Sequence, residues 1–235
     1  MKKTDILPTN DTARIDDILQ TSWRILKTRF IERRYEISSE APFQHYFAHI
    51  ISTIGDTYCI TRTEKFMVDL EVKLEVKNNN NKSKRNYIDI TCGFSRGGKE
   101  PKEKTAIELK FKTETQGAQN EARINVFRDV ERLEKAKSEH SFAQGRFYMI
   151  TDHQVYVNES KTGVGTVFAT HDGARTQANH EFHYPDSKSI EDVKVNLKNS
   201  YLFEWEKIDK KPINKSDKKE EWYFLEIEVL KPRTN

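Results

Sequence analysis

Two apolar runs near the middle of the chain carry charged residues at positions that could support chemistry. Asp89 interrupts the run 87–92, and Glu108 and Lys110 interrupt the run 105–112. Successive side chains of a β-strand point to opposite faces, so Glu108 and Lys110 would share one face. If the two runs form neighbouring strands, Asp89, Glu108 and Lys110 can meet at one edge of a sheet.

A cluster of this kind suits a hard divalent cation. Two carboxylates repel each other at short range unless a cation lies between them, and Mg²⁺ prefers ligand sets made of oxygen atoms. We therefore expect Mg²⁺, for which Mn²⁺ can substitute, and not zinc. A lysine on the same face can position or deprotonate water and can stabilise negative charge that develops on a phosphate. The pattern predicts metal-assisted hydrolysis of a phosphodiester.

The order of these residues resembles the signature of the PD-(D/E)XK nucleases, which include many restriction endonucleases and nucleases of recombination and repair. Asp89 is followed, after a gap, by Glu108-Leu109-Lys110 in an apolar strand. The resemblance covers about residues 40–153. It implies that Asp89 and Glu108 bind metal, that the Leu109 backbone carbonyl adds a ligand and that Lys110 activates water. It also implies an α/β fold with a restriction-endonuclease-like mixed β-sheet core flanked by helices, with C-terminal β additions.

The acid-x-lysine triplet also occurs elsewhere in this chain. Further copies are Glu71-Val72-Lys73 and Glu75-Val76-Lys77. Both lie in the run 66–77, where apolar residues alternate strictly with polar ones and predict a strand with one solvated face. We interpret these copies as charge pairs that face water. Ile88 stands where the family usually has a proline before its aspartate. An ordinary surface ion pair is the alternative interpretation of the first cluster.

Two helices are predicted before the strands. Asn10 is a suitable N-cap for the first, and Ser39 and Pro42 mark the start of the second, which ends near Gly55. The exposed face of the first helix is basic, and this face is either solvated or in contact with phosphates. Glu40 begins the second helix. By resemblance it assists metal binding, and by its position it is alternatively an acid that complements the helix dipole.

The second half of the chain predicts a crossover and a hairpin. A helix over about 121–136 leads to a short apolar strand at 147–151, which should pair parallel to the Glu108 strand. A further short strand is expected at 155–157. Two closing strands, at 201–205 and 222–230, should form a hairpin that extends the sheet or provides a dimerisation edge.

Two polar segments are candidates for DNA contact. The loop between Asp89 and Glu108 is basic and glycine-rich, and we expect it beside the metal site as a phosphate contact or as a solvated turn. The segment 160–185 has a composition that should not build a core, so it either reads base edges or is a solvated loop. The candidate DNA-binding residues are Arg96, Lys99, Lys104, Lys112, Gln116, Asn120, Arg123, His171, Arg175 and Gln177.

The 235 residues suit a single nuclease domain, 1–235, with a core at about 38–153 and a C-terminal elaboration at 160–235 for DNA recognition or dimerisation. Cys59 and Cys92, the only cysteines, lie in apolar contexts and favour a cytoplasmic protein with reduced thiols. No apolar run is long enough to cross a membrane. The sequence contains no Walker loop, so we expect no nucleotide cofactor. The net charge of +3 permits a nucleic-acid partner without requiring one.

The sequence therefore leads us to expect a Mg²⁺-dependent endonuclease that hydrolyses double-stranded DNA, of the type II restriction kind, acting as a homodimer. One alternative keeps the fold but assigns a repair, phage or defence nuclease that recognises DNA structure or ends. The other is a non-catalytic binding module in which the acids form only salt bridges.

Overall fold

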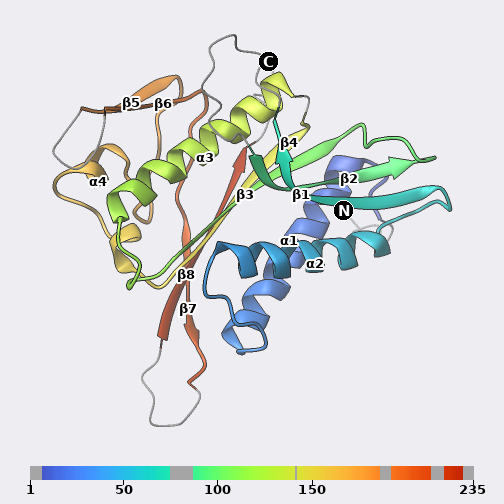
Figure 1. The fold of residues 1–235 in the computed structure, drawn as a ribbon, viewed down its shortest axis with the longest axis horizontal. Coiled ribbons are helices and arrows are strands. Elements are labelled where there is room, and N and C mark those ends of the chain that lie inside the picture. The colour runs from blue at the N-terminus through green and yellow to red at the C-terminus, as the bar shows by residue number, and fades with distance from the viewer. Residues whose placement is uncertain (1–6, 75–86, 141, 186–191, 213–219, 230–235) are drawn as a thin grey trace, which may run out of the picture.

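A computed structural model describes residues 7–74, 87–140, 142–185, 192–212 and 220–229. Its core is a six-stranded mixed sheet with the strand order β1-β2-β3-β4-β8-β7 (Figure 1). The strands are β1 (Glu64–Lys73), β2 (Tyr87–Arg96), β3 (Lys104–Lys112), β4 (Gln144–Thr151), β7 (Trp205–Lys210) and β8 (Glu220–Val229). The helices are α1 (Asp11–Ile31), α2 (Glu40–Thr57), α3 (Gln119–Glu139) and the short α4 (Val164–Val167). The expected α/β class is confirmed.

The sheet combines an antiparallel meander with one crossover. β1, β2 and β3 pair antiparallel in sequence order, and α3 then returns the chain so that β4 pairs parallel to β3. β8 pairs antiparallel to β4, and β7 forms the edge. The predicted parallel pairing is confirmed. A C-terminal hairpin extends the sheet, but its first strand is β7 at 205–210 and not the expected 201–205.

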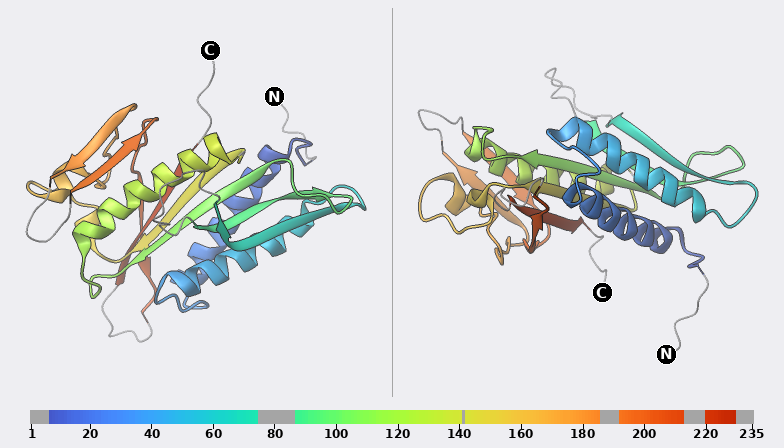
Figure 2. Two further views of the ribbon diagram at one scale, coloured as in Figure 1. Left: turned by 45° about the horizontal axis from the view of Figure 1, so that its top comes forward. Right: turned by 90° about the horizontal axis from the view of Figure 1, so that it is seen from below.

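Helices cover both faces of the sheet. α3 lies over one face, and α1 and α2 lie over the other (Figure 2). The apolar stripe of α3 packs on Phe147 and Met149 of β4. On the opposite face, Trp23 of α1 contacts Phe47 of α2 and Tyr148 of β4, with ring centroids 5.6 Å and 4.8 Å away. The sheet is therefore buried on both sides around β3 and β4.

The helix starts agree with the sequence. Asn10 has extended backbone angles, and its side chain accepts a hydrogen bond from the Ala13 N–H at 3.0 Å, so it caps α1. α2 begins at Glu40, directly after Ser39. The segment at 155–157, expected as a strand, is instead part of a short 3₁₀ helix, Gln154–Tyr156. Tyr156 is fully buried there.

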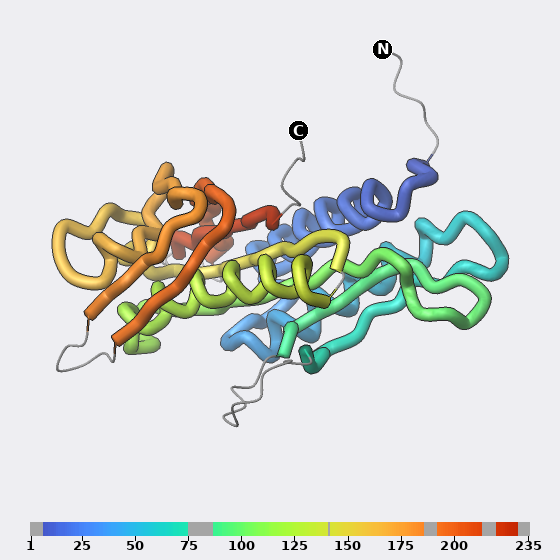
Figure 3. The backbone as a smooth tube through the Cα atoms, turned by 90° about the horizontal axis from the view of Figure 1, so that it is seen from above, coloured from blue at the N-terminus to red at the C-terminus, as the bar shows by residue number. Residues whose placement is uncertain are grey.

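The segment 160–185 builds part of the core, so the expectation that it could not is wrong. It contains α4 and β5 (His180–Tyr184), and β5 pairs with β6 (Val193–Leu197) in a second sheet beside α3 (Figure 3). Phe168 and Phe182 pack on Phe127 of α3, with ring centroids 5.1 Å and 4.9 Å away. A few widely spaced apolar residues are sufficient here because α3 presents a ready apolar surface.

Two expectations fall partly outside the described residues. The predicted strand 66–77 is present as β1, but the triplet Glu75-Val76-Lys77 and the polar tip at 78–85 are not described. The other triplet, at Glu71, is exposed as predicted. None of the described helices is long and apolar enough to span a bilayer.

Candidate functional site

Asp89 lies where the pairing between β2 and β3 ends. The paired residues stop at Ile90 and Ile107. One step further, the Asp89 carboxylate replaces a backbone acceptor, since its Oδ2 accepts a hydrogen bond from the Leu109 N–H at 2.7 Å. The Asp89 carbonyl accepts a hydrogen bond from Gln44 Nε2, also at 2.7 Å. These two bonds fix the Asp89 carboxylate against the edge of β3.

The strands are distorted at this level. Glu71, across from Asp89 on β1, has a φ of 52°, in the left-handed region. Ile90 and Cys92 pack beneath α1 and α2, whereas Ile88 belongs to the core beneath α3. Strict alternation along β2 predicts that all three residues share one face, and this prediction is wrong for Ile88. The strand twists at Asp89, and this twist is consistent with a carboxylate directed toward β3.

Glu108 and Lys110 lie on the α3 side of β3, as the alternation predicts. Glu108 is 2% exposed, and its Oε1 accepts a hydrogen bond from Arg132 Nη1 at 2.8 Å. Lys110 Nζ lies 3.2 Å from Asp129 Oδ2 and 3.2 Å from Glu40 Oε1. We define the acid cluster as Glu40, Asp89, Glu108, Lys110, Asp129 and Arg132.

Sequence reasoning missed Asp129 and Arg132 of α3. The Asp129 side chain is buried, and its Oδ1 lies 3.2 Å from Arg132 Nη1. A signal for Asp129 was present in the sequence. It occupies one position of a helical stripe at i, i+3 and i+4 spacing whose other members are apolar and buried. These other members are Ala122, Val126, Leu133 and Ala136.

The acid cluster holds more negative than positive charge. Burial raises the pKa of Asp89 to about 6, and the charges of Asp129 and Glu40 add to the rise. Burial and the charges of Asp129 and Asp89 likewise raise the pKa of Glu108 well above its usual value. Four carboxylates share two cations in this cluster, so full ionisation leaves a formal charge of −2. A divalent cation would balance that charge.

Lys110 is held as a cation. Burial lowers its pKa, but the charges of Asp129 and Glu40 outweigh this effect, and the net pKa lies above the usual value for lysine. Its ammonium is therefore protonated near neutral pH. In this state Lys110 can donate hydrogen bonds to a phosphate oxygen or to water, but it cannot act as a base.

The donor groups of the cluster fit a hard cation. Asp129 Oδ2 is buried and accepts no hydrogen bond from the described residues, although Lys110 is within ion-pair distance. The N–H and C=O of a strand residue face the same neighbouring strand, so the Leu109 carbonyl points toward the same side as its N–H, where Asp89 lies. Within the described ranges, no three His, Cys, Asp or Glu side chains form a ready set of metal ligands. The groups that could hold a cation are the Asp89 and Glu108 carboxylates and the Leu109 backbone carbonyl.

Glu40 lies at the margin of the cluster. Its side chain is 48% exposed and contacts Lys110 from the first turn of α2. Asp129 contacts the same ammonium from a buried position. The structure thus brings Glu40 next to the predicted site, but Asp129 is the better shielded of the two acids.

The basic loop lies far from the acid cluster, so its expected position beside the metal site is wrong. β2 continues through Gly93 to Arg96, and the turn follows at Gly97. Gly97 is eight positions after Asp89, which is about 26 Å along an extended strand. Arg96 is paired with Asp11 and Glu64 at 2.7 Å and 2.6 Å.

The other predicted DNA-binding residues are scattered. Arg123 is 2% exposed, so it does not lie on the open surface where it was predicted. Lys104 pairs with Glu100, and Gln116 accepts a hydrogen bond from the Thr113 N–H. The exposed members are Lys99, Asn120, Arg175 and Gln177, and the half-buried ones are Lys112 and His171. The structure does not gather them into one surface with the acid cluster.

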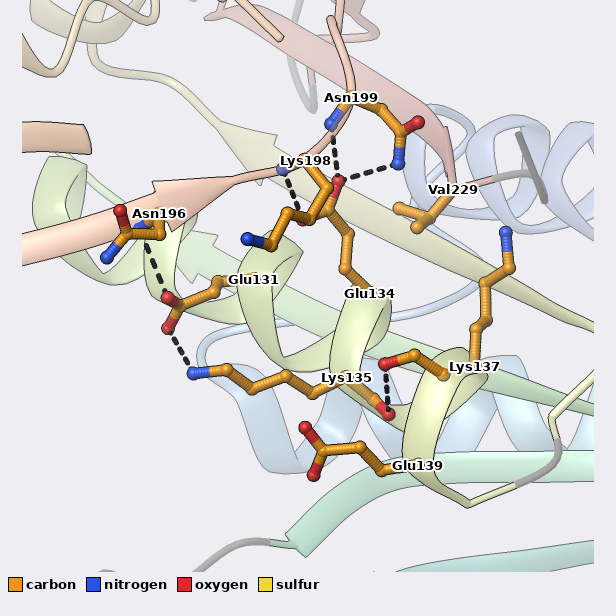
Figure 4. A pocket seen from close by; sticks show the side chains of 10 residues that line it. Glu131, Glu134, Lys135, Lys137, Glu139, Asn196, Lys198, Asn199 and Val229 are labelled. Atoms are coloured by element: carbon orange, nitrogen blue, oxygen red, sulfur yellow. Dashed lines mark hydrogen bonds and ion pairs between the residues drawn. The ribbon is translucent and has the colours of Figure 1, made fainter. Parts of the chain in front are cut away.

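A separate hollow of about 490 Å³ lies between α3, the end of β6 and the end of β8 (Figure 4). Glu134 accepts hydrogen bonds from the backbone N–H groups of Lys198 and Asn199 at 2.8 Å and 2.9 Å, and from the Tyr201 hydroxyl at 2.7 Å. Glu131 accepts a backbone N–H of β6 at 3.0 Å. These acids are satisfied by their surroundings, so we interpret the contacts as fastening β6 to α3.

Comparison with known proteins gives no relative for this chain. No protein-family model, no curated protein and no solved structure matches it. Function must therefore be argued from the geometry of the chain itself.

Proposed function

We propose that this protein is a Mg²⁺-dependent nuclease of the PD-(D/E)XK type, with Asp89, Glu108 and Lys110 at its catalytic centre. The observation that carries this proposal is the convergence of the three residues where the β2–β3 pairing opens, in a buried cluster with excess negative charge. The order of α1, α2, a three-stranded meander, α3 and the parallel strand β4 also supports a restriction-endonuclease-like core.

In this proposal Asp89, Glu108 and the Leu109 carbonyl hold the cation. When bound, Mg²⁺ supplies Lewis-acid activation of a phosphate oxygen and lowers the pKa of water. Lys110 donates hydrogen bonds to a phosphate oxygen or to the attacking water and balances negative charge that develops on the phosphate. Its ammonium is fixed by Asp129 and Glu40, which act as positioning residues.

Arg132 has a second positioning role. It holds the Glu108 carboxylate from the α3 side and opposes the rise in the pKa of Glu108 that burial causes. A guanidinium at this place lowers the cost of ionising a buried carboxylate. Its charge also reduces the repulsion between Glu108 and Asp129.

The substrate that fits best is double-stranded DNA, cut at specific sites by a homodimer in the manner of type II restriction endonucleases. Support for this finer assignment comes from the resemblance around Asp89 and Glu108 and from the size of the chain, which suits a stand-alone enzyme. Digestion of a defined plasmid tests it. Discrete fragments indicate site-specific cleavage, whereas smears or shortening from the ends indicate a structure- or end-specific nuclease.

The catalytic assignment is tested with Asp89→Asn and Glu108→Gln. Both variants should lose Mg²⁺-dependent cleavage and keep DNA binding, because an amide retains the shape of a carboxylate but not its charge. Glu181→Gln is the matched control, since Glu181 forms an exposed ion pair with Lys194 on the second sheet. Cleavage by the Asp89→Asn variant at the wild-type rate would refute the assignment.

A further inference from the structure

Among the residues that the structure describes, three arginines are almost completely buried, and carboxylates neutralise two of them. Arg14 contacts Asp11 and Glu64 at 2.5 Å and 3.0 Å. Arg146 contacts Asp16 at 2.6 Å and also pairs with two glutamates of β8. Removing a cation from water costs several kcal/mol unless an opposite charge compensates it. The carboxylates beside Arg14 and Arg146 provide this compensation.

Arg123, on the first half of α3, differs from both. It is 2% exposed, and its Nη2 donates a hydrogen bond to the Val155 carbonyl. Across the described ranges, no carboxylate lies within ion-pair distance of Arg123. Burial lowers the pKa of Arg123, and the phenol of Tyr156 is the one ionisable group in the described part of the chain that opposes this decrease. A buried guanidinium therefore lies here without an anionic partner.

The surroundings of Arg123 offer neutral hydroxyl groups. Tyr156 is fully buried, and no group of the described residues forms a hydrogen bond with its hydroxyl. A Cβ built on Gly165 would lie 1.9 Å from Arg123 Nη1 and 2.4 Å from Ser160 Oγ, so both groups border this glycine. A larger residue at Gly165 would occupy the place of the guanidinium. Ser160 is half-buried, whereas the other residues of the loop at 158–163 are exposed.

We propose that Arg123, Tyr156 and Ser160 form a binding site for a phosphate group. A guanidinium presents several N–H donors in a planar fork that matches phosphate oxygens, and hydroxyl groups can complete the set of donors. Phosphate supplies the negative charge that the buried Arg123 lacks. Arg123 and Asp129 are six residues apart on α3, which is about 9 Å along the helix axis, so the site is distinct from the acid cluster. The proposal does not depend on the nuclease activity.

Two sources of phosphate are possible, and the experiment separates them. One is inorganic phosphate or a terminal phosphomonoester, and the other is an internal phosphodiester of DNA. Thermal unfolding of the full-length protein is measured in EDTA at constant ionic strength. The ligand is either sodium phosphate or a short duplex that has 5′-hydroxyl ends, and sodium chloride is the reference. At about ten times its Kd, the bound source should raise Tm by about 3–6 °C relative to chloride. Titration calorimetry gives the affinity directly.

The key variant is Tyr156→Phe, which removes one hydroxyl and keeps the buried ring. It should weaken binding of the responding source about tenfold. Arg123→Lys, which loses the planar fork, should also weaken binding. Tyr148→Phe is the matched control, since the Tyr148 hydroxyl is buried but bonded to Glu226 at 3.1 Å, and it should bind like the wild type.

A response to phosphate alone, reduced in the two variants, supports a site for free or terminal phosphate. A response to the duplex alone, reduced in the same way, supports a phosphodiester site. The proposal is overturned if neither source stabilises the wild type. It is also overturned if the Tyr156→Phe and Arg123→Lys variants respond as the wild type does.

Discussion

Two groups of buried charges occupy opposite ends of β2, and they behave in opposite ways. At the end near α1, Arg14 and Arg96 hold Asp11 and Glu64. Hydrogen bonds from Arg14 help to lower the pKa of Glu64 to about 2. At the other end, four carboxylates share Lys110 and Arg132, and burial raises the pKa of Asp89 to about 6.

The difference separates scaffold from site. The balanced network around Arg14 joins α1 to β1 and β2, and it stabilises the fold without needing a ligand. Arg14 also lies over the Phe94 ring, 3.9 Å from its centroid. The acid cluster destabilises the fold when it is fully ionised, because its carboxylates repel one another. A cation that binds there relieves this repulsion, and the relief contributes favourably to the free energy of binding. We infer that uncompensated buried charge marks the places where this protein binds ligands.

The largest expected effect is on catalysis. Lys110→Met removes the ammonium between Asp129 and Glu40, and it should lower the rate of DNA cleavage about 10²–10³-fold, because the developing charge on the phosphate loses its donor. Single-turnover cleavage at saturating Mg²⁺ measures the effect. Lys194→Met is the control and should cleave as the wild type does. Equal rates for both variants would remove Lys110 from the mechanism.

A large effect on stability is expected at the end of β2 where the charges around Arg14 balance. Arg14→Met leaves the Glu64 carboxylate without its main buried partner, and it should lower the free energy of unfolding by about 3–5 kcal/mol. Urea unfolding followed by circular dichroism measures this. A loss of less than about 1 kcal/mol would mean that the network around Arg14 does not stabilise the packing of α1 on β1 and β2.

Substitution of an acid by its amide should have opposite signs at the two ends. The folded-state pKa of Asp89 is raised from 3.8 to about 6, so its ionisation destabilises the fold as the pH rises through this range, and the cost is complete above pH 6. Asp89→Asn should therefore stabilise the metal-free protein by about 1–3 kcal/mol near neutral pH. Its amide oxygen can still accept the Leu109 N–H.

The folded-state pKa of Glu64 is lowered from 4.5 to about 2, so its contribution is present above pH 4.5 and is lost as the pH falls toward 2. Glu64→Gln should destabilise the protein by roughly 2–3 kcal/mol near neutral pH. Tm measured against pH for both variants checks the two signs. The same sign for both would contradict the comparison.

The smallest effect is expected for an exposed pair. Glu181 and Lys194 lie 3.4 Å apart, with half-exposed side chains, on the second sheet. Glu181→Gln should change the free energy of unfolding by less than about 1 kcal/mol in either direction, because solvent screens the pair. This variant gives the baseline in thermal unfolding. A larger change would show that exposed charges also contribute to the differences above.

The alternation of residues along a strand predicted the relative placement of site residues that belong to the same strand. Glu108 and Lys110 share a face because alternation alone determines it. The position of the basic loop could not be predicted in this way. Gly93 suggests the end of a strand, but β2 continues through it, because the missing side chain makes room for Pro101 and the Glu103 carbonyl, which would lie 2.8 Å and 2.7 Å from a Cβ.

Tertiary packing determined the remaining features. Arg123 was predicted to contact DNA, yet it is buried, and Gly165 of α4 and Ser160 border its guanidinium. The core formed by Phe168 and Phe182 depends on residues far apart in sequence that meet only on α3. Asp129 could have been found as the one acid in the apolar stripe of α3. Its contact with Lys110 could not, because it depends on how α3 crosses β3.

Direct measurement of cation binding tests the central claim. Isothermal titration of the wild type with Mn²⁺ at pH 6, in buffers of different ionisation enthalpy, should show binding with release of protons, because the acids with raised pKa lose protons when the cation binds. Asp89→Asn and Glu108→Gln should lose this binding, and Glu64→Gln should keep it. Absence of Mn²⁺ binding by the wild type, or equal binding by the Asp89→Asn variant, would contradict the account.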